Sequence, residues 1–250
     1  MEQLWAPDNL AIIALTFMLA GFVKGVVGLG LPTVSLALLT AAFGLKTAIV
    51  LMIVPSLVTN IWQGVVGGNF KVLMKRLWPM FAAAAVCTWF ATAAFKVADP
   101  RMLAMLLGVL IAVYAGLALV TPQVPPPGRF EPWMGPLMGG LTGVASGLTG
   151  SFVVPAVLYM QALGLSRDQL IQAMGLSFTF ATLILGLSFS GRGMMATDGV
   201  LISATGLIPA AVGMVIGQRV RRRFSETLFR RVFFLSLLIV GAYIIARAAF

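Results

Sequence analysis

The stretch GFVKGVVGLGLP at residues 21–32 interrupts a long apolar run, and GGLTGVASGLTGSFVVP at residues 139–155 interrupts another in the same way. The first run, at residues 10–43, would make a straight helix of about 50 Å, because an α-helix rises 1.5 Å per residue. A bilayer is crossed by roughly 20 apolar residues, so this run is too long for one crossing. Glycine and proline inside both runs therefore predict helices that break within a membrane.

The composition of the whole chain places it in a membrane. Apolar residues make up 60% of the 250 residues and charged residues only 10%, whereas a soluble domain averages about 45–50% and about 25%. Mean hydropathy is +1.03. This leaves too little polar surface to cover a water-soluble globule. We therefore expect an all-α, polytopic integral protein of the cell membrane (inner or plasma), with many crossings.

The same composition removes several chemistries. The chain has no histidine, which excludes Ser–His nucleophilic pairs, zinc hydrolysis and haem–His ligation. Its single cysteine, Cys87, cannot form an internal disulfide or a two-cysteine metal site. We expect no catalytic residues, no cofactor and no metal. The formal charge of +10 resides in loops beside apolar runs, which favours anionic lipid over nucleic acid as a partner.

Two helix starts can be placed from capping residues. Runs 77–95 and 102–120 each give one span, and the turn Asp99-Pro100 between them supplies an N-cap and a first-turn proline. Ser166, with Gln169 three residues later, is a capping box that predicts another helix start.

The two halves of the chain resemble each other. Gly147 follows Gly28 by 119 residues, and LIPAAVGMVIG around Pro209 matches LWPMFAAAAV around Pro79 at a separation of 130. This indicates an internal repeat of about 120 residues. We expect one transmembrane repeat at residues 1–120, a proline-rich linker at 121–132, and a second repeat at 133–250.

The basic clusters bear on the orientation of these repeats. Lys71, Lys75 and Arg76 form one cluster, and Arg219, Arg221, Arg222 and Arg223 form another. Both clusters can be cytoplasmic only if each half crosses the bilayer an odd number of times. The positive-inside rule thus favours inverted repeats, with the broken segments as re-entrant or paired helices.

Duplicated apolar halves with one broken helix each are typical of secondary transporters. A break is tolerated in a membrane only where it is buried in protein or lines a watery cavity, and a helix N-terminus there favours an anion. The glycines could instead serve close helix packing. Because a glycine cluster recurs at equivalent positions in both halves, the binding of an anion is favoured over packing alone. An anion channel would share these features, and a membrane-embedded enzyme is the weaker alternative, since no nucleophile–base pair or phosphate-binding loop is present.

Polar groups near the breaks are candidates to bind such an anion. Lys24 would raise the local anion concentration or, alternatively, reach a membrane interface. Hydroxyl and amide groups could donate hydrogen bonds, although serine and threonine in membrane helices more often bond their own backbone. Ser35, Gln63, Ser146, Gln172 and Thr179 are further polar candidates. The predicted substrate-binding residues are Lys24, Gly28, Gly30, Thr33, Asn60, Gly147, Thr149, Gly150, Ser151 and Ser177.

Three segments resemble the TauE/SafE family of sulfite and organosulfonate exporters across about residues 10–247. They are AGFVKGVVGLGLPTVSLALL, GLTGVASGLTGSFVVPAVLYMQALGLSRDQLIQAMGLSFTFATLILG and IGQRVRRRFSETLFRRVFFLSLLIVGAYII. The resemblance implies export of a small sulfur-containing anion, sulfite or an organosulfonate such as sulfoacetate, bound between the two glycine-broken helices. The partners expected are this anion and the lipid bilayer. The resemblance leaves open which anion is carried and whether the chain forms a homo-oligomer.

Overall fold

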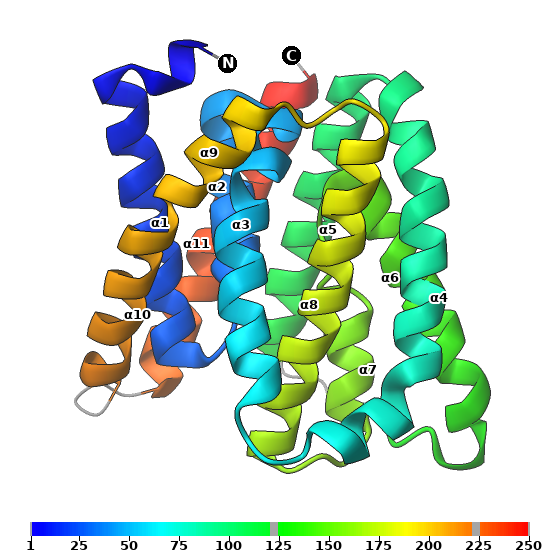
Figure 1. The fold of residues 1–250 in the computed structure, drawn as a ribbon. Helices are drawn as coiled ribbons and strands as arrows, with labels where there is room; N and C mark the ends of the chain where they lie inside the picture. Colours follow the sequence, from blue (N-terminus) through cyan, green and yellow to red (C-terminus); the bar gives the residue numbers. More distant parts are fainter. Residues whose placement is uncertain (1, 121–124, 222–225, 250) are drawn as a thin grey trace. The chain divides into compact units, whose positions relative to one another are not determined.

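The structure is a computed structural model that describes residues 2–120, 125–221 and 226–249. Within these residues the regular structure is entirely helical (Figure 1). Residues 121–124 of the expected linker, and Arg222 and Arg223 of the second basic cluster, lie outside the described residues. The helices are η1 (Glu2–Trp5), α1 (Pro7–Val27), α2 (Leu31–Phe43), α3 (Leu45–Val65), α4 (Phe70–Val97), α5 (Pro100–Val120), η2 (Gly128–Phe130), α6 (Glu131–Thr149), α7 (Ala156–Ala162), α8 (Arg167–Gly191), α9 (Thr197–Thr205), α10 (Leu207–Val220) and α11 (Glu226–Ala249).

Seven helical segments of the described chain are long and apolar enough to cross a bilayer. They lie in α1, α3, α4, α5 and α8, in the α9–α10 segment Thr197–Val220, and in α11. Helix α2 has 13 residues and α7 has 7, so both are too short to cross alone. The expectation of an all-helical, multi-pass membrane protein is confirmed.

Both capping predictions are confirmed. The Arg101 backbone N–H donates to Asp99 Oδ1 at 2.8 Å, and α5 begins at Pro100. At the start of α8, the Gln169 backbone N–H donates to Ser166 Oγ, and the Ser166 backbone N–H donates to the Gln169 side chain. These bonds satisfy N–H groups that a helix start otherwise leaves without acceptors.

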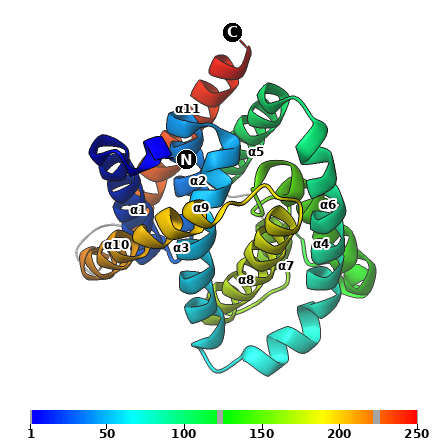
Figure 2. The same ribbon diagram turned by 45° about the horizontal axis from the view of Figure 1, so that its top comes forward.

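The described chain forms two compact units, and each unit takes segments from both halves of the sequence. Unit 1 comprises Met1–Pro55, Asp99–Thr121 and Met195–Phe250. Unit 2 comprises Ser56–Ala98 and Pro122–Met194. In unit 1, α1 packs along α10 (Figure 1), and α5 packs along α11. In unit 2, α4 packs along α6 (Figure 2) and also contacts α8.

Glycines let the paired helices approach at backbone distance. Gly21 and Gly25 of α1 face α10, and Gly139 and Gly143 of α6 face α4. A Cβ atom at any of these four positions would lie within 2.3 Å of a carbonyl oxygen of the neighbouring helix. All four glycines are helical, so each break is shorter than the glycine-rich stretch, 21–32 or 139–155, that predicts it. Part of each stretch thus serves helix packing, as the alternative interpretation of the glycines proposed.

Candidate functional site

The first break separates α1 from α2 in unit 1. Gly28 adopts a left-handed conformation with φ 85°, and its N–H donates to the Lys24 carbonyl at 2.8 Å, which ends α1. Gly30, with φ 112°, precedes α2, and its carbonyl accepts the Val34 N–H at 2.8 Å. The N–H groups of the first turn of a helix have no acceptor within it, and the turn that begins at Leu31 is buried.

The polar side chains around this first break are buried. Lys24 lies in the last turn of α1 with 4% of its surface exposed, so the structure places it in the helix beside the break. Thr33, in the first turn of α2, is buried, and its hydroxyl makes no hydrogen bond within the described part of the chain. The Ser35 hydroxyl, by contrast, donates to the Leu31 carbonyl at 2.7 Å. Thr33 is therefore the hydroxyl here that can donate to a ligand.

The second break separates α6 from α7 in unit 2. Gly150 is left-handed with φ 74°, and its N–H donates to the Ser146 carbonyl at 2.7 Å. The chain then runs without helix to Pro155, and α7 starts at Ala156. This break has the same glycine cap as the first, followed by a longer non-helical segment.

At this second break, one hydroxyl forms hydrogen bonds within the protein and another does not. The Thr149 hydroxyl donates to the Ala145 carbonyl at 2.7 Å and accepts the Ser151 N–H at 3.2 Å. The Ser151 hydroxyl makes no hydrogen bond with any described residue, and 7% of Ser151 is exposed. On α8, the Ser177 hydroxyl is likewise without a hydrogen bond among the described residues. The hydroxyls of Ser151 and Ser177 can thus donate to a ligand.

Several other candidates have structural partners. Gly147 lies inside α6, where a Cβ atom would come within 2.6 Å of the Ala91 Cβ, so it is a packing glycine. The Gln63 amide donates to the Ile171 carbonyl at 2.8 Å and joins α3 to α8. The Gln172 amide donates to the Gly64 carbonyl at 3.0 Å. These amides hold unit 2 together.

The ten predicted site residues fall into two groups. Unit 1 holds the lysine, the two glycines and the threonine of the first break: Lys24, Gly28, Gly30 and Thr33. Unit 2 holds the residues of the second break and of the helices around it: Asn60, Gly147, Thr149, Gly150, Ser151 and Ser177. Lys24, Gly28, Gly30 and Thr33 lie at or beside the first break, and Thr149, Gly150 and Ser151 lie at the second.

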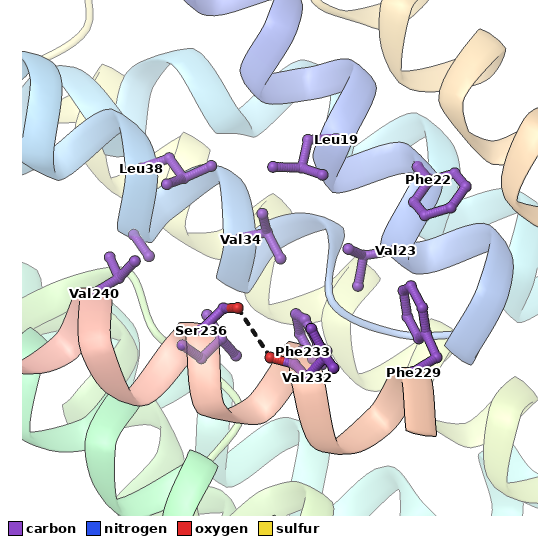
Figure 3. Close-up of a pocket in the computed structure, with 12 residues that line it drawn as sticks. Leu19, Phe22, Val23, Val34, Leu38, Phe229, Val232, Phe233, Ser236 and Val240 are labelled. Atoms are coloured by element: carbon purple, nitrogen blue, oxygen red, sulfur yellow. Dashed lines mark hydrogen bonds between the residues drawn. The ribbon is translucent and has the colours of Figure 1, made fainter. Parts of the chain in front are cut away.

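An apolar cavity of about 190 Å³ lies between α1, α2 and α11 of unit 1 (Figure 3). Ser236 is the polar side chain among its lining residues, and its hydroxyl donates to the Val232 carbonyl at 2.9 Å. Val23 and Phe233 line this cavity and are also the nearest neighbours of Gly30. The cavity therefore borders the first break but offers no free donor to an anion.

A second cavity, of about 430 Å³, lies in unit 2 where α4 meets the start of α6. Arg76 lines it and donates to Glu131 twice, from Nε to Oε1 at 2.6 Å and from Nη2 to Oε2 at 2.9 Å. These hydrogen bonds hold the pKa of the Glu131 carboxyl below its usual range, so it is charged at neutral pH. In the sequence, Arg76 stands out only as part of a basic cluster, because no local pattern links residues 55 positions apart.

Comparison with known protein families gives a match over most of the chain. The sequence model of the family described as Sulfite exporter TauE/SafE matches residues 13–244. No curated protein and no solved structure matches the chain. The match covers both breaks and all the candidate site residues.

Proposed function

Because the chain belongs to the TauE/SafE family of sulfite exporters, we propose that it exports sulfite or an organosulfonate such as sulfoacetate across the inner or plasma membrane. A transporter family fits the expectation that the chain is not an enzyme. Seven candidate spans agree with a multi-pass membrane protein. The proposed substrate is a small anion whose charge is spread over several oxygen acceptors.

The observation that carries this proposal is the chemistry shared by the two breaks. Each break has a left-handed glycine cap, Gly28 or Gly150, and a buried residue, Thr33 or Ser151, whose hydroxyl has no hydrogen bond among the described residues. A hydroxyl that makes no hydrogen bond within the protein can donate to a ligand that supplies an acceptor. Sulfite and sulfonate oxygens accept such hydrogen bonds, and those bonds are strengthened by the negative charge.

Lys24 adds the charge that an anion requires. It is buried one turn before Gly28 in a helix that is long and apolar enough to cross a bilayer. A cation at such a depth is expensive and is usually functional. We propose that the groups at each break can bind the anion and that Lys24 raises the anion concentration at the first break.

The helix contacts support a duplicated origin for the two breaks. Gly139 follows Gly21 by 118 residues, and their contact partners Met80 and Ala210 are separated by 130 residues. In each pair, a helix from one half of the sequence packs on a helix from the other half. We infer that residues 1–120 and 133–250 are inverted repeats joined by the 121–132 linker.

This comparison also refines the correspondence between the breaks. Gly28 lies three residues beyond the packing glycine Gly25, whereas Gly150 lies seven residues beyond Gly143. The difference is about one helical turn. The counterpart of the Gly28 cap is therefore Gly150, and Gly147 belongs to the additional turn that packs on α4.

The experiment that tests the substrate is flux of labelled sulfite into liposomes containing the purified protein. We expect saturable flux and competition by unlabelled sulfite and sulfoacetate, with weaker competition by zwitterionic taurine. Equal competition by sulfate would show that the site does not select sulfur anions of this class. Absence of saturable flux would contradict the proposal, and unitary currents in planar bilayers would identify an anion channel instead.

A further inference from the structure

The two helices that follow the breaks share a feature at their far ends. Near the end of α2, the Ala41 carbonyl accepts a hydrogen bond from the Arg247 guanidinium of α11. At the C-cap of α7, the Leu163 carbonyl accepts one from Arg76 of α4, at 3.2 Å. In both units, an arginine that is distant in sequence thus donates to a carbonyl at the C-terminal end of the short helix that follows a break.

Such a bond matters more for a short helix than for a spanning one. The last carbonyls of any helix have no intrahelical donor, and they carry the negative end of the helix dipole. A guanidinium there satisfies a carbonyl and opposes that partial charge. Helix α7 has 7 residues and α2 has 13, so each depends on neighbouring groups for its position.

We propose that Arg76 and Arg247 are positioning residues for anion binding, which fix α7 and α2 so that the groups at the preceding breaks keep their orientation. The Arg76 guanidinium would set the segment that contains Ser151, and the Arg247 guanidinium would set the turn that contains Thr33. This inference rests on the proposed function, because it assumes that the anion binds at the breaks.

The two arginines differ in the number of groups that they hold. Arg76 forms a fork over both carboxylate oxygens of Glu131 and also reaches the Leu163 carbonyl. Arg247 donates to the Ala41 carbonyl, its one acceptor within the described residues. Lysine keeps the charge but cannot reproduce a planar fork. A lysine should therefore replace Arg247 better than Arg76.

Each unit contains a matched control. In unit 2, Arg192 donates to the Trp89 carbonyl at 2.6 Å and also lies over the Trp89 ring. In unit 1, Arg230 donates to the Ala118 carbonyl at 3.0 Å. These arginines bond the backbone of α4 and α5, neither of which follows a break. Arg192→Met and Arg230→Met remove a bond of the same kind, to carbonyls that lie outside α7 and α2.

The first test measures sulfite flux in liposomes. For Arg76→Met and Arg247→Met, we expect the KM for sulfite to rise roughly fivefold or more, the size that loss of one charge-assisted hydrogen bond allows. The maximal rate and the melting temperature in detergent should change little. Arg247→Lys should restore most of the affinity and Arg76→Lys should not. An unchanged KM, or an equal rise in Arg192→Met and Arg230→Met, would overturn the proposal.

The second test does not require transport. Because Cys87 is the single cysteine, Cys87→Ser gives a background in which Thr33→Cys or Ser151→Cys reports the local structure through its rate of thiol labelling. Arg76→Met should change the rate at position 151 by roughly threefold or more and leave position 33 alone. Arg247→Met should give the opposite pattern.

The two tests separate two kinds of failure. If labelling shows this crossed pattern but the wild-type protein carries no sulfite, the proposed function fails, while the control of each break segment by its arginine stands. If sulfite flux is saturable but the labelling rates at positions 33 and 151 are unchanged in Arg76→Met and Arg247→Met, the positioning roles are overturned. The proposed function then stands.

Discussion

A Cβ atom on Gly21 would lie 2.1 Å from the carbonyl oxygen of Ala210, so the backbones of α1 and α10 touch at this point. In unit 2, a Cβ atom on Gly139 would likewise lie 2.1 Å from the carbonyl oxygen of Met80. Lipid tails are as apolar as the helices, so van der Waals packing of this kind drives their association. Only glycine permits it here.

We therefore predict that Gly21→Ala weakens the packing of α1 on α10. The added methyl group meets backbone rather than a flexible side chain, and overpacking of this kind costs about 1–3 kcal/mol. The melting temperature of the purified protein in mild detergent should fall. Gly116→Ala is the control, because no atom lies within 4 Å of the corresponding Cβ on α5. Equal melting temperatures for the two variants would refute the packing role of Gly21.

The glycine-rich stretches show what sequence could predict and what it could not. Their position inside apolar runs predicts two breaks, and the structure has a left-handed glycine in each, Gly28 and Gly150. The sequence could not separate packing glycines such as Gly25 and Gly143 from the capping ones. The difference depends on the helix that lies opposite, and the hydrophobic pattern does not identify this partner.

The same reason limits prediction of the polar groups. Thr149 and Ser151 look equally suited to bind an anion, yet the Thr149 hydroxyl donates to the carbonyl one turn back and the Ser151 hydroxyl does not. A residue within a helix has such a carbonyl within reach, and a residue after the helix end has none. The contact of Arg76 with Glu131 joins residues 55 positions apart and has no local signal.

The Ser151 hydroxyl should contribute directly to anion binding. We predict that Ser151→Ala raises the KM for sulfite by roughly tenfold, because a hydrogen bond to a charged group is lost. Thr142→Val is the control, since the Thr142 hydroxyl already donates to the Met138 carbonyl at 2.7 Å. Both values come from flux measured as a function of sulfite concentration. A KM in Ser151→Ala equal to that of the control would remove Ser151 from the site.

Lys24 should act through its charge. Lys24→Met should raise the KM for sulfite, and Lys24→Arg should retain most of the wild-type affinity, because the charge remains near the first break. If both variants match the wild type in the same concentration series, the side chain serves only to reach a membrane interface.

The absence of histidine from the chain, and of carboxylates from the interior of its apolar runs, predicts the energetics of export. The chain has no histidine, and its carboxylates lie at the ends of apolar runs. A membrane potential that is negative inside supplies about 2.3 kcal/mol per charge per 100 mV, which favours outward movement of an anion by roughly 50-fold. We predict electrogenic export without obligatory exchange of protons or sodium.

Liposomes with a potassium–valinomycin potential, and no gradient of protons or sodium, measure this directly. Sulfite should accumulate on the positive side, at a rate that rises with the potential. Uphill flux driven by a proton gradient, together with indifference to the potential, would mean that a boundary carboxylate such as Asp168, or the substrate itself, carries a proton.

The most direct test of anion binding at the breaks is sulfite flux through Gly150→Leu, compared with Gly164→Leu. Both glycines are left-handed, with φ 74° and 66°, so leucine is strained at either position, but only Gly150 caps a break. No atom lies within 4 Å of a Cβ at Gly164. We predict saturable labelled-sulfite flux for the wild type and Gly164→Leu, and background flux for Gly150→Leu at equal amounts of protein in the membrane. Wild-type flux through Gly150→Leu would contradict binding of the anion at this break.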